Sequence, residues 1–409
     1  MSSRDYAIIH KHGFRDRKIL LELSSNQYEL LDEFETKPVN EIKPTRWIRI
    51  DEQLRFIEFL KHVGLNEFVV GKKSKNGYGD SMSLYDCAST VHKYKCTSDP
   101  SHSIHVKYPM CGKRGICPRC SKAYAHKRAM IMYQWIKSNL ALNLSFDLKM
   151  NQIVLTLPIE LQDMNQKLFV KMIKEMMNQM EIESYGYVIQ DDHSDNPLSS
   201  PYLHAHILTL NMREDNGRMT QNDYFFDLDE MRLKWKSIIE KFSGVIVNGD
   251  VNLNTQYASI LNDPSRVLHM LAYCYRYPID DLFNVQIRKQ SRDYTRTSIL
   301  SYVQTQQNES EPQLGFNILQ IDIADKIRKM VKTKPRLVWC GWLTSAKRGQ
   351  LKEMMKEPDE PEIFWNDMKY FEKKLDERAR ICRDCGEPLH DKPFEIGEYV
   401  GDNEPRIQS

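Results

Sequence analysis

The sequence predicts an α+β protein, and two observations lead to that class. Apolar, β-favouring segments alternate with amphipathic helical segments from about residue 143 to about residue 306. A short Cys-rich, basic stretch precedes them, and a charged stretch follows. We therefore expect a sheet domain with helices on one face, preceded by a small metal-binding module and followed by a mostly helical C-terminal region.

The N-terminal part of the chain contains two expected helices. Residues 50–63 form the first, and residues 71–83 form a loop because they are rich in Gly, Lys and Ser. Residues 121–142 have helical periodicity and contain neither Gly nor Pro. That segment is therefore expected to be one long helix.

The predicted sheet domain follows, with helices between its strands. Short apolar runs bounded by polar or turn residues indicate strands at 151–157, 185–190, 202–210 and 244–253. Longer amphipathic stretches indicate helices at 166–180, 229–242 and 262–277. The last helix has a clear start, since Asn262-Asp263 can cap it and Pro264 fits its first turn, and Pro278 ends it.

Composition divides the chain into four parts. These are an N-terminal extension (1–86), a zinc-binding module with a basic helix (87–142), the sheet domain (143–306) and a C-terminal region (307–409). A polar linker at 304–313 leads into the last part, where a charged helix is expected at 362–380. The final residues are expected to be disordered.

The overall composition suits a soluble protein. Apolar residues make up 41% of the chain and charged residues 28%. No run approaches the roughly 18 apolar residues of a membrane span, and the N-terminus lacks the apolar core of a signal peptide. We therefore expect a cytoplasmic protein without a membrane partner.

The net charge of +2 hides two strongly basic stretches. Each contains nine Lys or Arg against a single acid, at 91–130 and at 325–352. Such local fields favour a nucleic-acid partner, although a single basic run is more often a solvated face. The candidates for DNA binding lie in the first stretch: Lys113, Arg114, Arg119, Lys122, Lys127 and Arg128.

Nine cysteines are present, and their clustering in a cytoplasmic chain favours metal ligands over disulfides. Cys111, Cys117 and Cys120 have the Cys-x5-Cys-Pro-x-Cys spacing of a knuckle that suits a structural Zn²⁺. Cys96 is the expected fourth ligand and Cys87 the alternative. The competing ligands are three histidines, His92, His102 and His105, and buried free thiols are the simpler interpretation.

A second knuckle lies near the C-terminus, where two residues separate Cys382 from Cys385. No partner pair follows it in the sequence. His390 and Cys340 could contribute, or the knuckle could borrow ligands from the first cluster. A second zinc site and a pair of free thiols both remain open from the sequence alone.

The strand at 202–210 contains His204 and His206 one residue apart. Strand side chains alternate between the two faces of a sheet, so both imidazoles point the same way. Two imidazoles on one face make half of a divalent-metal site. The alternative is a pair of strand histidines that make ordinary hydrogen bonds.

The helix at 262–277 is rich in tyrosine. His269 and Tyr273 are four residues apart, which places them on one helix face, and Tyr277 extends that face by one more turn. Taken alone, this pattern is more typical of an aromatic stripe packed on a sheet.

These pieces occur in a recognisable order: the cysteine knuckle, the apolar strand at 151–157, the His-x-His strand and the tyrosine helix. In this order the chain resembles the HUH endonucleases, and more narrowly the single-tyrosine rolling-circle replication initiators of plasmids. The resemblance covers about residues 87–294. It implies an antiparallel sheet with helices, of the ferredoxin or RRM-like kind.

The resemblance also assigns roles to residues. Tyr273 aligns with the nucleophile and Arg276 with a lysine of the family motif, while His269 stands where the family has a glutamate. His204 and His206 would hold Mn²⁺ or Mg²⁺, with Gln190 as the first candidate for a third ligand and Asp191 as the next. The cysteine module would hold a structural Zn²⁺.

The implied reaction is nicking and rejoining of single-stranded or hairpin origin DNA through a 5′-phosphotyrosine intermediate. Host helicase and polymerase would be partners in rolling-circle replication of a plasmid or virus. Two other interpretations remain open. One is an HUH-type transposase, which shares nearly the same motifs, and the other is a non-catalytic, zinc-dependent DNA-binding regulator.

Overall fold

The computed structural model describes most of the chain outside its two ends. The described residues are 50–70, 82–190, 203–222, 227–249, 251–284, 314–334, 336–344, the single positions 347, 350 and 354, and 368–398. The following predicted features lie outside them: most of the 71–83 loop, Asp191, the end of the 87–294 resemblance, the 304–313 linker and the expected disordered end. Among the described helices, none is long and apolar enough to cross a membrane.

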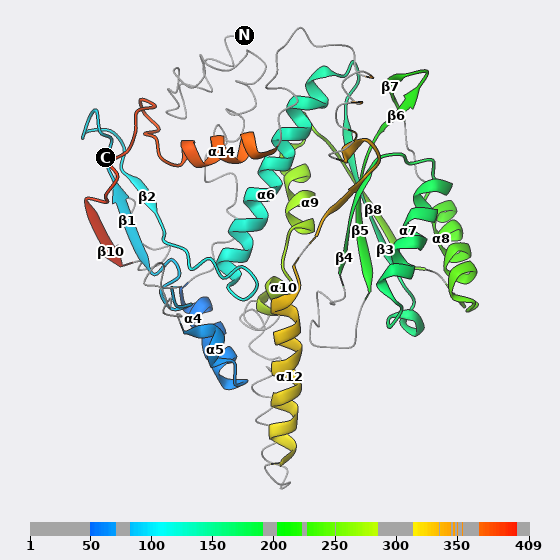
Figure 1. The fold of residues 1–409 in the computed structure, drawn as a ribbon, viewed down its shortest axis with the longest axis horizontal. Helices are drawn as coiled ribbons and strands as arrows, with labels where there is room; N and C mark the ends of the chain where they lie inside the picture. The colour runs from blue at the N-terminus through cyan, green and yellow to red at the C-terminus, as the bar shows by residue number, and fades with distance from the viewer. Residues whose placement is uncertain are drawn as a thin grey trace.

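The fold is mixed α/β and its sheets are antiparallel. The main sheet has five strands in the spatial order β8-β3-β5-β4-β9. Their bounds are β3 (Lys149–Thr156), β4 (Tyr185–Gln190), β5 (His204–Leu210), β8 (Leu253–Ser259) and β9 (Val338–Cys340). Helix α7 (Gln166–Gln179) connects β3 to β4, and helix α8 (Leu228–Ser243) lies between β5 and β8 (Figure 1).

Helices cover both faces of this sheet, so the expectation of helices on one face was wrong. α7 and α8 pack on the face that carries Ile153, Leu155 and Ile207. The opposite face lies against α6 (Pro118–Asn139) and α9 (Pro264–Cys274) (Figure 1). The reason lies in α6, since every residue from Ile131 to Asn139 is buried. A helix buried around its circumference needs neighbours on more than one side.

Most predicted elements of the sheet domain are confirmed, with two corrections. The strand expected at 244–253 is absent, because residues 244–249 and 251–252 are not in a strand and β8 begins only at Leu253. The apolar Val245 and Ile246 resemble a strand but are exposed. Helix α9 ends at Cys274, before Tyr277, since a residue that precedes proline disfavours the helical conformation.

The sequence analysis also missed a hairpin. Strands β6 (Met212–Asp215) and β7 (Arg218–Gln221) pair with each other around Asn216-Gly217. Both turn residues have positive φ, 52° and 77°. Asn-Gly between two short strands is the strongest local hairpin signal, so this element could have been predicted.

The rest of the described chain forms two smaller bodies. Strands β1 (Thr90–Tyr94), β2 (His105–Lys107) and β10 (Glu395–Glu398) form a three-stranded sheet in the order β10-β1-β2. A separate apolar cluster joins four helices: α4 (Ile50–His62), α5 (Asn66–Val69), α10 (Ile279–Phe283) and α12 (Leu314–Lys332). Helix α14 (Met368–Arg378) lies against α6, and short 3₁₀ turns occur at Ala141–Asn143, Ile159–Leu161 and Gly341–Leu343 (Figure 1).

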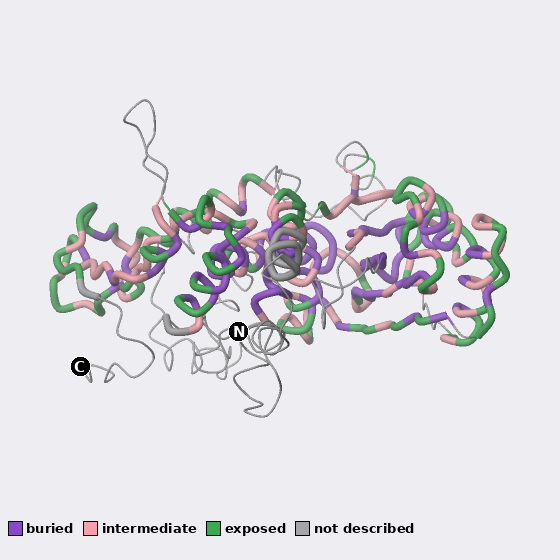
Figure 2. Tube along the Cα trace, turned by 90° about the horizontal axis from the view of Figure 1, so that it is seen from below, coloured by how far each residue is buried: buried purple, intermediate pink, exposed green. Residues whose placement is uncertain are grey.

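Residues 307–409 therefore contribute to several parts of the molecule. β9 extends the main sheet, α12 packs with the N-terminal helices, and β10 pairs with β1. Figure 2 shows buried segments concentrated in the main sheet and the central helices. The β1-β2-β10 end carries mostly half-buried and exposed residues.

Candidate active site and metal centres

His204 and His206 point from β5 toward α9. Both side chains are buried, and their ring centroids lie 5.0 Å apart. The ladder places Thr156 of β3 and Gln190 of β4 directly opposite His204. The His-x-His pair therefore occupies one end of the sheet face that α6 and α9 cover.

Two glutamines contact the histidines. Gln190 Oε1 lies 3.1 Å from His204 Nε2, and Gln152 Nε2 lies 3.2 Å from His206 Nδ1. The amide of Gln152 can turn its oxygen toward the ring and accept the Nδ1 proton, which leaves a lone pair on Nε2. That Nε2 atom is buried and makes no hydrogen bond among the described residues.

The charge state of His206 also suits a ligand. Burial, helped by the neighbouring His204 and Arg276, holds the pKa of His206 well below its ordinary value. The ring is therefore neutral at neutral pH, and neutral imidazole is the form that binds metals. Without a metal, an unpaired nitrogen in this place is costly.

The spacing of Gln190 and His204 fits an octahedral ion. Ligands at the Mg²⁺ distance of about 2.1 Å, set at right angles, lie about 3.0 Å apart. The observed separation of Gln190 Oε1 and His204 Nε2 is 3.1 Å. The two side chains can therefore occupy adjacent positions around one ion.

Tyr273 lies beside this group. Its ring centroid is 4.5 Å from that of His206. The guanidinium of Arg276 lies 4.0 Å above the Tyr273 ring, and its Nη2 atom bonds Asp281 at 2.8 Å. The structure thus brings Tyr273 and Arg276 to the histidine face, whereas His269, one turn earlier in α9, is exposed to solvent.

The neighbouring tyrosines are oriented elsewhere. Tyr275 packs against the hydrophobic core under α6 and α9, and burial raises its pKa. Tyr277 packs edge-on against Tyr124, with ring centroids 5.8 Å apart, and burial raises its pKa too. Among the described tyrosines of this segment, Tyr273 is the one in ring contact with His206.

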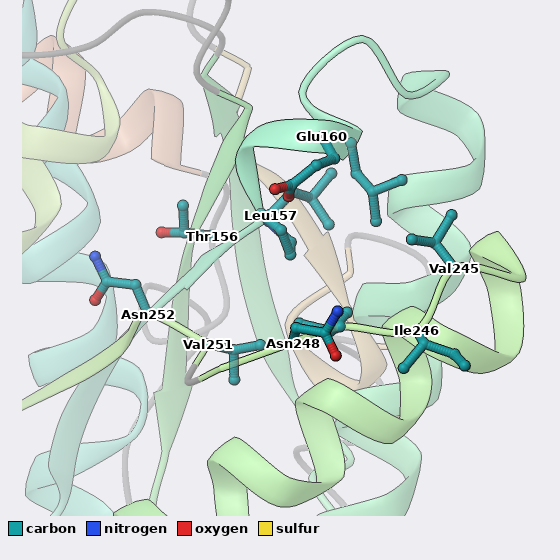
Figure 3. A pocket seen from close by; sticks show the side chains of 11 residues that line it. Thr156, Leu157, Glu160, Val245, Ile246, Asn248, Val251 and Asn252 are labelled. Atoms are coloured by element: carbon teal, nitrogen blue, oxygen red, sulfur yellow. The ribbon is translucent and has the colours of Figure 1, made fainter.

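A pocket of about 370 Å³ lies at the end of β3. Its wall residues Leu157, Val247 and Val251 belong to the cluster that packs with α7 and α8, on the sheet face opposite the histidines. Thr156, which lies opposite His204 in the ladder, forms part of its wall. Figure 3 shows Leu157 and Glu160 on one side, with Val245 and Ile246 from the segment after α8 on the other. The lining mixes apolar and polar residues, and the volume falls in the range of ligand sites.

The first cysteine group differs from the expected one. Cys87, Cys111, Cys117 and Cys120 converge, and the sulfur–sulfur separations Cys87–Cys120, Cys111–Cys120 and Cys87–Cys117 are 3.5–3.6 Å. Cys87 supplies the fourth sulfur, so the preference for Cys96 in this group was wrong. The sequence left the fourth ligand open because both Cys87 and Cys96 precede the knuckle. In the structure, β1 lies between these two cysteines and places them at different sites.

Cys96 belongs to a second group, with His102, Cys382 and Cys385. The second knuckle therefore takes its partners from the N-terminal module, one of the arrangements left open by the sequence. Cys340, by contrast, lies in edge strand β9, and His390 is outside the group. Both cysteine groups could hold a metal ion such as zinc.

The basic residues chosen for DNA binding are partly engaged within the chain. Arg119 is buried and donates to the carbonyl oxygens of Cys87 and Ala88, so its assignment to DNA binding was wrong. Lys113 donates to two backbone carbonyls. The others lie over aromatic rings or near acids: Arg114 and Arg128 over Tyr124, Lys122 over Phe283, and Lys127 and Arg128 beside Glu372.

Sequence reasoning missed Gln152 and Asp281. Both are polar side chains on buried elements, and a buried polar residue is the signal that could have drawn attention to them. No protein-family model matches this chain, and no curated protein or solved structure matches it either. The function must therefore be inferred from the site itself.

Proposed function

We propose that this protein nicks and rejoins single-stranded DNA through a covalent bond to Tyr273, as an HUH endonuclease that initiates rolling-circle replication of a plasmid or virus. The observation that carries the proposal is the position of Tyr273. It stands beside a face formed by His204, His206 and Gln190, with its ring 4.5 Å from that of His206.

The order of elements in the sheet domain supports the proposal. Apart from the β6-β7 hairpin between β5 and α8, the chain runs β3-α7-β4-β5-α8-β8, and the four strands lie in the order β8-β3-β5-β4. This is the connectivity of the ferredoxin-like βαββαβ unit that the resemblance implies. In this chain α9 covers the face that carries the histidines, so the nucleophile and the ligands come from different elements.

Each residue would have a separate role in the cleavage reaction. A divalent Mn²⁺ or Mg²⁺ on His204, His206 and Gln190 would polarise the scissile phosphate. Tyr273 Oη forms a bond to phosphorus while the bond to the 3′-oxygen breaks. The phenol loses its proton and the departing 3′-oxygen gains one, which leaves a 5′-phosphotyrosine and a free 3′-hydroxyl. Arg276, anchored by Asp281, places positive charge over the tyrosine ring.

The pocket at the end of β3 suits an unpaired base. Its walls combine apolar side chains with Thr156, Glu160 and two asparagines. A base that leaves its stack can bury its faces against apolar groups and bond polar ones at its edge. We therefore propose single-stranded or hairpin origin DNA as the substrate, with host helicase and polymerase acting after the nick.

The first cysteine group would hold a structural Zn²⁺. Two thiolates on one tetrahedral zinc at about 2.3 Å lie about 3.8 Å apart, close to the observed 3.5–3.6 Å. Backbone amides of Cys111 and Gly112 also donate to Cys87 Sγ and Cys120 Sγ. With four sulfurs filling the coordination sphere, the site has no open position for catalysis.

The test is a search for the covalent product. Purified protein with Mn²⁺ and a pool of labelled single-stranded oligonucleotides should yield an adduct that survives a denaturing gel. Tyr273→Phe removes the attacking oxygen and should abolish the adduct, while Tyr275→Phe, the matched control, should keep it. Adduct formation by Tyr273→Phe, or full activity after exhaustive metal removal, would contradict the proposal.

A further inference from the structure

Four potential ligands from two distant parts of the chain meet beside the small β-sheet. Cys96 and His102 come from the segment between β1 and β2, and Cys382 and Cys385 come from the segment after α14. Cys96 Sγ lies 3.4 Å from Cys385 Sγ, and Cys382 Sγ lies 3.7 Å from His102 Nδ1. All four ligand atoms lie within 4.8 Å of one another.

These separations match one tetrahedral ion. A sulfur at about 2.3 Å and an imidazole nitrogen at about 2.0 Å from the same zinc lie about 3.5 Å apart. The observed separation of sulfur and nitrogen is 3.7 Å. Three sulfurs and one nitrogen are a ligand set that selects zinc among the common divalent ions.

His102 is held in the orientation that a ligand needs. Its Nε2 atom lies 3.5 Å from Asp99 Oδ2, while its Nδ1 atom faces Cys382. Asp99 is itself fixed by the backbone amide and hydroxyl of Ser101. A carboxylate behind the far nitrogen of an imidazole is the usual support of a metal-binding histidine.

The surrounding backbone also has the form of a metal knuckle. The amide of Gly386 donates to the carbonyl of Cys382, and Gly386 has a φ of 76° that favours glycine. The amide of Ser98 donates to Cys96 Sγ. His105, the other histidine nearby, is occupied because its Nε2 accepts from the amide of Arg383.

This region lacks a sufficient core of its own. Its apolar cluster consists of Cys96, Cys382 and Leu389, with Tyr94 and Cys385 packed against it. Figure 2 shows the same end of the molecule with mainly half-buried and exposed residues. So small a body usually needs a metal or disulfides to fold.

We propose that Cys96, His102, Cys382 and Cys385 bind a second structural Zn²⁺, which fastens the C-terminal segment to the N-terminal module. The pairing of β1 with β10 and the bridge between Cys96 and Leu389 then depend on this ion. The inference is independent of the endonuclease proposal, because it concerns folding and not the chemistry at Tyr273.

The test measures zinc in the full-length protein. The purified chain should contain two zinc ions, and Cys385→Ser and His102→Ala should each contain one. Both side chains are only partly buried, so these changes leave no large cavity. Cys340→Ser, a cysteine outside both groups, should keep two ions, and Cys120→Ser should lose the ion of the first group.

Hydrogen exchange supplies a second readout. In Cys385→Ser, the amides of residues 381–398 and 90–107 should exchange at least tenfold faster, while those of the main sheet stay unchanged. Two zinc ions retained by both Cys385→Ser and His102→Ala would overturn the proposal. So would a native chain that is two hydrogens lighter because a Cys96–Cys385 disulfide replaces the metal.

Discussion

At the scale of single residues, the site depends on polar side chains that face a buried surface. His206 is 5% exposed and is neutral because burial lowers its pKa. Its Nδ1 atom has a partner in Gln152, whereas its Nε2 atom has none among the described residues. Gln152 therefore determines which ring nitrogen is available to a metal, although it need not touch the ion.

Removing Gln152, the partner of His206 Nδ1, should weaken metal binding. We expect Gln152→Ala to require about 10–100-fold more Mn²⁺ for half-maximal cleavage, because the imidazole loses the group that orients it. The matched control is Gln256→Ala, an exposed residue of β8 directly opposite Gln152. Titration of cleavage against Mn²⁺ gives the comparison, and equal curves for the two variants would show that Gln152 has no orienting role.

At the scale of elements, helix α9 carries Tyr273 and its start is well defined. The Asp263 side chain accepts from the amide of Arg266, and Pro264 occupies the first turn. Helix α8 is capped in the same way, since Asp227 accepts from the amides of Asp229 and Glu230. The two helices lie on opposite faces of the sheet, so removal of the α8 cap is a matched control for removal of the α9 cap.

Removing each cap should separate stability from activity. Asp263→Ala and Asp227→Ala should each lower the free energy of unfolding by about 1 kcal/mol, which urea denaturation measures. The rate of adduct formation should fall in Asp263→Ala because the first turn of α9 loosens. The same rate should be unchanged in Asp227→Ala. Equal adduct rates in the two variants would indicate that α9 does not position Tyr273.

At the scale of the whole molecule, the C-terminal part folds back over the N-terminal module. Helix α14 lies against α6, where Glu372 and Asp376 face Lys127, and Glu372 also faces Arg128. Two of the basic residues chosen for DNA binding are thus partly neutralised by the chain itself. Exposed ion pairs of this kind contribute little to stability, so their loss should leave the fold intact.

Neutralising the acids should therefore strengthen DNA binding. The double variant Glu372→Gln, Asp376→Asn should bind single-stranded DNA more tightly and with a steeper dependence on salt, because Lys127 and Arg128 become available to phosphates. The control is Glu175→Gln, Glu230→Gln, which changes charge equally but releases Lys241 and Lys234 beside the opposite sheet face. DNA affinity should fall more steeply with salt for the first double variant than for the control. Equal slopes would exclude DNA binding by Lys127 and Arg128 of α6.

The sequence by itself determined the local elements. A short apolar run predicted β4 at Tyr185–Gln190, and strand alternation set His204 and His206 on one face. The Asp263-Pro264 signal marked the start of α9. These features depend on residues within a few positions of one another, so a local pattern contains them. The Cys-x5-Cys-Pro-x-Cys spacing likewise indicated three sulfurs of the first cysteine group, which the structure brings together.

Only the tertiary structure decided which distant residues meet. It put Cys87 rather than Cys96 in the first group, joined Cys96 to Cys382 across the chain, and placed Gln152 against His206. It also buried Arg119 and covered both faces of the sheet. Such contacts follow from strand order, register and the return of the C-terminal segment, and no short stretch of sequence carries that information.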